Sequence, residues 1–257
     1  MSLMPVLFIG HGSPMNALAH NAFTESLARL GQELPRPRAI LCVSAHWETQ
    51  GTQVLYAQEP ITIHDFYGFP EQLFKMEYPA HGDLQMAHET QELIPNAQLS
   101  DKWGLDHGTW SVLVHMYPHA DIPVYQLSLD LTLPAEQHYE IGKQLQKLRE
   151  EGVLILGSGN IVHNLRMLRR RTGGDEVYPW AHKFDDDIKQ ALLKRDDQGV
   201  IRYEELYPEE SILAVPTPEH FVPLLYTLGA SRPEDKVSFP FEGFEMGSLS
   251  MRSVMWS

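Results

Sequence analysis

The stretch PVLFIGHGSP, residues 5–14, decides the fold, because a short apolar run is closed by glycine and followed at once by a histidine. The apolar half is rich in β-branched and aromatic residues, a pattern typical of a buried strand. A helical pattern follows over residues 21–30, with Gly31 expected to end it, and then a second apolar run over 39–44. Strand, helix and strand in this order predict a βαβ unit with a parallel pair.

The same alternation continues along the chain and shows no internal repeat, low-complexity tract or linker. We therefore expect one α/β domain over residues 1–257, with a central mostly parallel or mixed sheet flanked by helices. A ligand site is expected at the carboxyl ends of the strands. Further strands are expected at 124–129 and 153–156, a turn at 157–160, helices at 83–93, 109–117, 135–151, 179–194 and 222–228, paired strands at 236–244 and 247–254, and long loops near 57–72, 100–108 and 205–221.

Composition excludes several classes of partner. The formal charge of −14 and the sequence pI of about 5.3 argue against binding to nucleic acid or to anionic lipid, since both require a basic surface. Cys42 is the one cysteine, so no intrachain disulfide can form, and its apolar neighbours predict that it is buried. The first residues lack a secretory signal and no apolar run is long enough to cross a membrane. These features predict a cytoplasmic protein, monomeric or a small homo-oligomer.

Three of the 13 histidines follow strand-like runs. His11 and His46 each come two residues after an expected strand, and His163 comes seven residues after another. A single histidine in such a place usually caps an element or bonds a carbonyl group. Three at the same edge of a sheet favour a shared function, because ligands bind outside the carboxyl ends of parallel strands.

Three further histidines stand in loops that can reach the same edge. His107 precedes an expected helix, His220 follows a proline-stiffened turn, and His64 lies in a loop rich in aromatic residues. The other histidines are assigned to the surface or to helix faces: His20, His81, His88, His115, His119, His138 and His182.

The histidines indicate a metal site without fixing the metal. Imidazole suits zinc, copper, iron and nickel, and the chain has neither a Cys-x-x-Cys pair nor a His-Glu-x-x-His sequence. The residues alone therefore leave open a zinc hydrolase and a non-haem iron oxygenase. The Gly-Ser-Gly piece at 157–159 lacks a full dinucleotide fingerprint, so no organic cofactor is expected.

Six segments taken together, in order, resemble the class III extradiol ring-cleavage dioxygenases, and most closely the 4,5-DOPA extradiol dioxygenase type. The resemblance runs from about Pro5 to Met251, nearly the whole chain. The segments are Gly10-His-Gly-Ser-Pro14, Ser44-Ala-His-Trp47, His64-Asp-Phe-Tyr-Gly-Phe-Pro70, Asp106-His-Gly108, Gly157-Ser-Gly-Asn-Ile-Val-His-Asn164 and Thr217-Pro-Glu-His220.

The resemblance implies roles for the histidines. His11 and His46 are similar to the two metal-binding histidines of the family. Protocatechuate-cleaving relatives use a glutamate as third ligand, whereas the matching segment here places His220, with Glu219 beside it. His163 resembles the acid/base histidine next to the metal and can also serve as a fourth ligand. His107 resembles a second histidine of the acid/base or oxygen-facing kind.

The implied reaction is the opening of a catechol such as L-DOPA by dioxygen to a muconic semialdehyde. It needs one divalent metal per chain, with Fe(II) expected for activity and Zn(II) plausible as bound. The small-molecule catechol and dioxygen are the expected partners. A catechol hydroxyl must lose a proton, which a histidine can take. His64, Phe66 and Tyr67 are expected to contact the substrate, the aromatic rings as a wall for its ring.

Two alternatives remain at the level of sequence. One is a zinc-dependent hydrolase that uses metal-bound water. The other is a non-enzymatic binding protein of the same fold, which the presence of five candidate histidines argues against.

Overall fold

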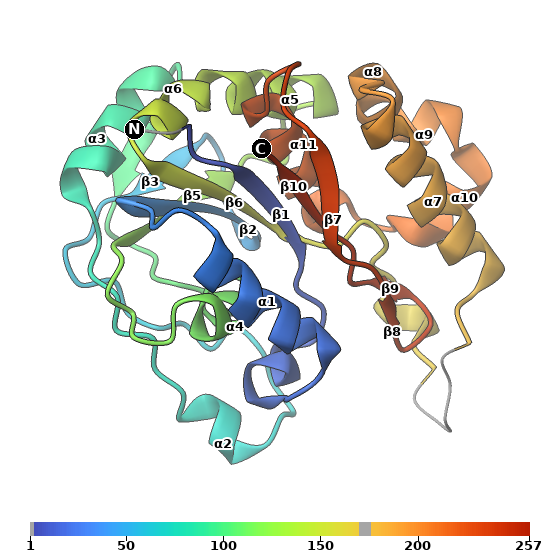
Figure 1. Cartoon of the computed structure of the whole chain (residues 1–257), viewed down its shortest axis with the longest axis horizontal. Coiled ribbons are helices and arrows are strands. Elements are labelled where there is room, and N and C mark those ends of the chain that lie inside the picture. Colours follow the sequence, from blue (N-terminus) through green and yellow to red (C-terminus); the bar gives the residue numbers. More distant parts are fainter. Residues whose placement is uncertain (1–2, 170–175) are drawn as a thin grey trace.

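The chain folds around an eight-stranded sheet in the order β4-β3-β5-β2-β6-β1-β10-β7 (Figure 1). A computed structural model describes residues 3–169 and 176–257. The sheet strands are β1 (Val6–Gly10), β2 (Ala39–Glu48), β3 (Gln53–Leu55), β4 (Gln98–Ser100), β5 (Val124–Leu129), β6 (Val153–Gly159), β7 (Val237–Phe241) and β10 (Ser253–Trp256). A small second sheet joins β8 (Phe244–Glu245) and β9 (Leu249–Ser250).

The middle of the large sheet is parallel and part of its periphery is antiparallel. β5, β2, β6 and β1 pair in parallel, whereas β10 runs antiparallel to β1 and to β7, and β3 runs antiparallel to β5. The expected mixed sheet, with paired strands near the C-terminus, is confirmed. The parallel strands end together, so the segments that follow β1 and β6 meet at the same edge.

Helices cover both faces of the sheet, and polar side chains begin several of them. The side chains of Asn21, Asp83 and Asp106 accept a hydrogen bond from the first turn of α1, α3 and α4. The helices are α1 (Ala22–Glu33), α2 (Glu71–Phe74), α3 (Leu84–Leu93), α4 (His107–Met116), α5 (Ala135–Gln144), α6 (Gln146–Glu150), α7 (Pro179–Leu193), α8 (Asp197–Ile201), α9 (Tyr203–Leu206), α10 (Pro208–Ala214) and α11 (Val222–Ala230), with 3-10 turns η1 (Pro14–Leu18), η2 (Leu165–Met167) and η3 (Pro218–His220).

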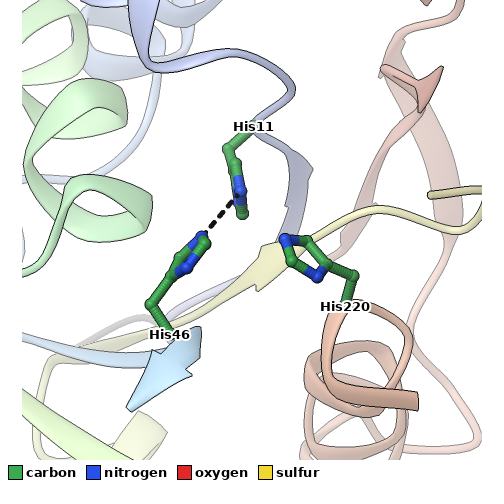
Figure 2. A group of neighbouring side chains, drawn as sticks. All are labelled: His11, His46 and His220. Atoms are coloured by element: carbon green, nitrogen blue, oxygen red, sulfur yellow. Dashed lines mark hydrogen bonds between the residues drawn. The ribbon is translucent and has the colours of Figure 1, made fainter. Parts of the chain in front are cut away.

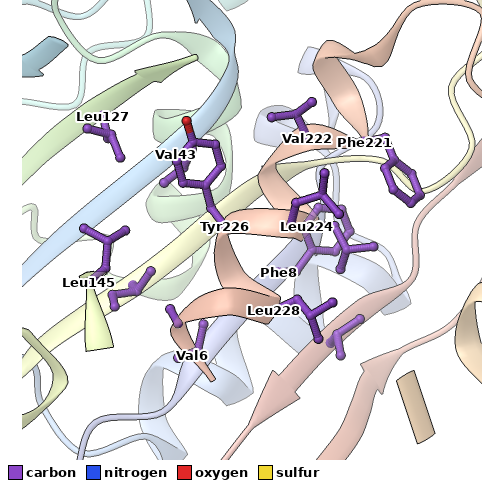
Figure 3. Close-up of a cluster of buried hydrophobic side chains, with 14 of the residues drawn as sticks. Val6, Phe8, Val43, Leu127, Leu145, Phe221, Val222, Leu224, Tyr226 and Leu228 are labelled. Carbon is purple, nitrogen blue, oxygen red and sulfur yellow. The ribbon is translucent and has the colours of Figure 1, made fainter. Parts of the chain in front are cut away.

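The alternation of side chains along β1 divides the core in two. Val6 and Phe8 lie in the core on the face covered by α11, whose side chains belong to the same cluster (Figure 3). Leu7 and Ile9 point to the opposite face, where α1 and α4 lie. Both faces are therefore buried, which is the usual condition of a sheet with a parallel centre. Cys42 lies in this second core, as expected. Among the described residues, no helix has both the length and the apolar composition needed to cross a membrane.

Three helical predictions were wrong in detail. Gly31 does not end α1: an added Cβ would lie 1.9 Å from the carbonyl oxygen of Met116, so the glycine allows α1 to pack closely on α4. The helix expected over 135–151 is divided at Leu145 into α5 and α6. The loop expected over 205–221 contains α10 and η3, because prolines at the first positions of both favour a helical start.

The turn expected at 157–160 was also wrong, since β6 continues through Gly159. An added Cβ at Gly157 would lie 2.7 Å from the carbonyl oxygen of Pro223, and one at Gly159 would lie 2.1 Å from that of His220. These glycines thus permit close approach of another backbone to the strand. β2 likewise continues to Glu48, beyond the end expected at Ser44, so that His46 lies within the strand.

Gly159→Ala is predicted to push η3 away from β6, because the new methyl group would overlap the carbonyl oxygen of His220. We expect a free energy of unfolding lower by about 1–3 kcal/mol, the usual cost of overpacking. We also expect reduced metal content, since His220 would move with η3. Chemical denaturation and elemental analysis measure the two effects.

The matched control is Gly243→Ala, where the added Cβ meets only the side chain of Phe241, at 3.1 Å. Metal content in Gly159→Ala equal to that of the control would contradict this reading of the glycine.

Candidate metal centre

Three histidines from separate elements converge at the carboxyl edge of the parallel strands. His11 follows β1, His46 lies near the end of β2 and His220 ends η3, and their rings point toward one another (Figure 2). One ring nitrogen from each lies within 4.8 Å of the other two, a spacing that a single metal ion can bridge. The expectation that distant histidines meet at this edge is therefore confirmed for these three residues.

The outer nitrogen of each ring faces an oxygen, and for His11 and His220 a hydrogen bond assigns the tautomer. The Ser158 hydroxyl donates to the carbonyl oxygen of Gly108 (2.5 Å), so its oxygen accepts from Nδ1–H of His11 (2.9 Å). Nδ1 of His220 lies 3.1 Å from the Glu219 carboxylate. Nδ1 of His46 lies 3.3 Å from the Asp65 carboxylate. Nδ1 of His11 and Nδ1 of His220 therefore carry a proton, and Nε2 of these two rings presents a lone pair. Metal-binding histidines commonly have such oxygen partners.

The inner nitrogens of two rings form a hydrogen bond. Nε2 of His11 and Nε2 of His46 are 3.2 Å apart (dashed line in Figure 2), and a cation shared by the two nitrogens would take the place of the proton between them. Burial, reinforced by the neighbouring histidines, lowers the pKa of His46 to about 3 and holds the pKa values of His11 and His220 well below the usual value. The rings are thus neutral at pH 7. Neutral imidazole donors in this arrangement fit a divalent metal ion.

His107 lies beside this group and shares a carboxylate with it. Asp65 accepts hydrogen bonds from the backbone N–H of His107 (2.9 Å) and from its Nδ1 (2.8 Å), while the same carboxylate faces His46. Burial raises the pKa of Asp65, but the hydrogen bonds from the side chain and the backbone of His107, with the electrostatic attraction of that ring, outweigh burial and lower the pKa. The carboxylate fixes the proton of His107 on Nδ1 and leaves Nε2 as an acceptor.

His163 stacks on His220 with its ring nearly parallel, at 9°, and with the ring centroids 3.4 Å apart. It forms a second possible ligand group with Glu219 and His220, and it is not part of the group that contains His11 and His46. Burial lowers its pKa to about 4, so the ring is neutral at pH 7 and can accept a proton.

A cavity of about 830 Å³ opens onto these five histidines. Phe66, Phe69 and Tyr67 form part of its wall, and Tyr67, with 92% of its surface exposed, stands at the rim. The predicted His64 does not line the cavity. Its Nε2 bonds the carbonyl oxygen of Met76 (2.9 Å), and its ring packs against Trp110, because consecutive residues of the extended loop point to opposite sides.

Sequence reasoning missed the oxygen partners of the histidines. Asp65 is the most important of these partners, since its carboxylate contacts the rings of His46 and His107. In the same segment, the sequence analysis selected the neighbouring His64 as a site residue instead. The available signal was a carboxylate in a loop already expected to reach the site. Ser158, expected to lie in a turn, is a strand residue with its hydroxyl against His11. No pattern in the sequence shows that contact, because it joins residues 147 positions apart.

A group of converging histidines beside an open cavity is typical of a metal-dependent enzyme. Comparison with known proteins identifies the family of enzymes. The family described as "Catalytic LigB subunit of aromatic ring-opening dioxygenase" matches residues 5–251. The chain belongs to this family and is an aromatic ring-opening dioxygenase that depends on a metal. Family membership favours this activity over the zinc hydrolase and the non-enzymatic binding protein.

Several relatives are similar over nearly their whole length. The chain is 48% identical to a protein of Escherichia coli K12 named 4,5-DOPA dioxygenase extradiol, covering 98% of this chain and 94% of the relative. It is 36% identical to a protein of the same name from Beta vulgaris, covering 100% and 97%. The crystal structure of an uncharacterised Escherichia coli K12 protein superposes with a TM-score of 0.85 at 44% identity, covering 99% of this chain and 100% of that one.

Replacing His11, His46 or His220 by alanine is predicted to abolish stoichiometric metal binding while leaving the fold largely intact, because each removes one of three converging ring nitrogens. Elemental analysis after loading with Zn(II), together with circular dichroism, tests this. His64→Gln is the matched control and should keep its metal, since His64 lies outside the cavity. Full metal content in any of the three variants would remove that histidine from the ligand set.

Proposed function

We propose that the protein is an extradiol dioxygenase that opens a catechol such as L-DOPA with dioxygen to a muconic semialdehyde. The observation that carries the proposal is the convergence of His11, His46 and His220, with one ring nitrogen of each within 4.8 Å of the other two and all three rings lining an open cavity. Relatives named 4,5-DOPA dioxygenase extradiol support the substrate class and the extradiol outcome.

These three histidines would hold one divalent metal ion, and we propose Fe(II) for the active enzyme. When bound, Fe(II) supplies sites for the catecholate and dioxygen side by side and passes charge between them. The ligand set is neutral, in contrast to sites with a carboxylate ligand. Zn(II) would be held by the same donors but has no redox chemistry. No organic cofactor is needed, since the electrons for the new C–O bonds come from the catechol.

His163 and His107 would move the protons of the reaction. A catechol must lose a hydroxyl proton to bind through both oxygens, and a neutral imidazole accepts it. The lowered pKa keeps His163 neutral at pH 7, and its place against His220 puts it next to the ligand group. His107 would hold a second proton at Nε2, because Asp65 fixes the other proton at Nδ1 and stabilises the ring once it is charged.

The aromatic loop would hold the substrate ring and limit the entry of water. Phe66 packs edge-to-face on Phe69 and on His107, so the wall is ordered next to one of the histidines that move protons. Tyr67, exposed at the rim beside Gly68, would cover a bound ring.

Ring opening is predicted to require Fe(II) and dioxygen together. Protein loaded with Fe(II) and supplied with L-DOPA should consume about one dioxygen per catechol and produce the yellow semialdehyde, whereas protein loaded with Zn(II) should bind the catechol without turnover. An oxygen electrode and visible absorbance follow the two signals. Equal activity with zinc, or dependence on added NADH, would contradict the mechanism.

His163→Gln is predicted to retain metal and catechol binding but to turn over at least about a hundredfold more slowly, the scale of a general acid/base contribution. Glutamine fills similar space and cannot take a proton. Steady-state kcat is compared with catechol affinity measured on the zinc-loaded variant. Turnover close to wild type would remove His163 from proton transfer, and loss of the metal would instead make it a ligand.

A further inference from the structure

The wall of the cavity carries one lysine or arginine among the residues that the structure describes. Arg169 lines the same cavity as the five histidines. Asp65 is the acidic residue in that lining, and its carboxylate is already bonded to His107 and close to His46. The charge available to a ligand on the described wall is therefore positive and belongs to Arg169.

Arg169 is held in place by its surroundings. Its backbone N–H donates to the carbonyl oxygen of Met246 (2.9 Å), and its guanidinium lies 4.0 Å from the ring centroid of Tyr178. Its Nη1 donates to the carbonyl oxygen of Glu176 (3.1 Å). Stacking and hydrogen bonds of this kind orient the planar guanidinium before a ligand arrives, which lowers the entropy lost on binding.

The present carboxylate partner of Arg169 can be replaced. Glu176 pairs with it, but the side chain of Glu176 is 82% exposed and that of Arg169 is 28% exposed. Because the carboxylate of this ion pair is largely in water, the pair contributes little to stability. A ligand carboxylate inside the cavity would be shielded on one side by the wall, so that its charge-assisted hydrogen bonds to the guanidinium would be stronger.

The apolar part of the wall fits the same kind of ligand. Leu165, Leu168 and Leu249 line the cavity together with the histidines and Arg169. If the two hydroxyl groups of a catechol lie at the histidines, a substituent para to one of them would contact these leucines. A carboxylate at the end of that substituent would then face the guanidinium. The formal charge of −14 repels anions from the protein as a whole, so an anionic ligand needs such a local cation.

We propose that Arg169 binds a carboxylate on the side chain of the substrate, and that the enzyme selects catechols with a carboxylate-terminated para substituent. The inference rests on the proposed ring-opening function, because the histidines fix where the ring lies. It assigns substrate choice to Arg169, two residues after η2 and outside the group of residues that would hold the metal.

The test compares 3-(3,4-dihydroxyphenyl)propionate with its methyl ester, which has the same catechol but no negative charge. Wild-type protein should favour the acid by about tenfold or more in kcat/KM, since a charge-assisted pair exceeds the 1.4 kcal/mol that corresponds to a factor of ten. Arg169→Met should bring the ratio close to one, mainly by raising KM for the acid. Arg169→Lys should retain part of the preference.

Arg166→Met is the matched control, because Arg166 is exposed on η2 and does not line the cavity. It should keep the wild-type ratio. Equilibrium binding of acid and ester to zinc-loaded protein gives the same comparison without turnover, and Arg169→Met should lose the difference in Kd there too.

The outcomes separate the two proposals. Turnover of both compounds with an acid-to-ester ratio that Arg169→Met leaves unchanged would overturn the role of Arg169 and leave ring opening standing. Turnover of neither compound by wild-type protein with verified Fe(II) would count against the proposed function, and equal binding of acid and ester to the zinc-loaded protein would then overturn the role of Arg169 as well.

Discussion

The hydrogen bond from the backbone N–H of Asn160 to the carbonyl oxygen of His220 (2.8 Å) is the contact on which the site depends. It forms only because Gly159 has no side chain where the backbone of η3 approaches β6. Strands of one sheet position His11 and His46. His220 is distant from both in the sequence and lies at the end of η3, where no strand fixes its position. The close approach supplies that fixed position, so three ligands of different origin keep one geometry.

The carboxylate of Asp65 gives the site its second constraint. It accepts a hydrogen bond from Nδ1 of His107, lies 3.3 Å from Nδ1 of His46, and belongs to the loop that carries the aromatic wall. Burial and mutual repulsion lower the pKa values of four of these histidines, His11, His46, His163 and His220, so these four rings are not charged together. One carboxylate beside two rings therefore helps to fix the orientation of both rings, as the hydrogen-bond partners of metal-binding histidines do in other metal sites.

Much of the fold could be predicted from the sequence, because apolar runs closed by glycine and amphipathic helical patterns depend on neighbouring residues. The βαβ start, the mixed sheet and the placing of His11 and His46 at one edge follow from such patterns and from the rule for strand ends, whereas the ligand role of His220 came from the family resemblance. Gly157 and Gly159 were misread as a turn, since nothing local separates a glycine that bends the chain from one that admits another backbone. Asp65 was missed and His64 misplaced for a similar reason: the side of the loop that faces the cavity is decided by packing on Trp110 and His107.

The two halves of the cavity wall are held by different contacts. Phe66, Tyr67 and Phe69 belong to a loop tied by Asp65 to the histidines, so a change there disturbs the proton positions as well as the fit of the ring. Leu165, Leu168 and Arg169 lie on a segment whose described polar contacts, such as that of Arg169 with Met246, avoid the histidines. A substitution in this second half therefore leaves the described hydrogen bonds of the histidines in place. Within a single cavity, one wall is coupled to the histidines and the other is mechanically independent of them.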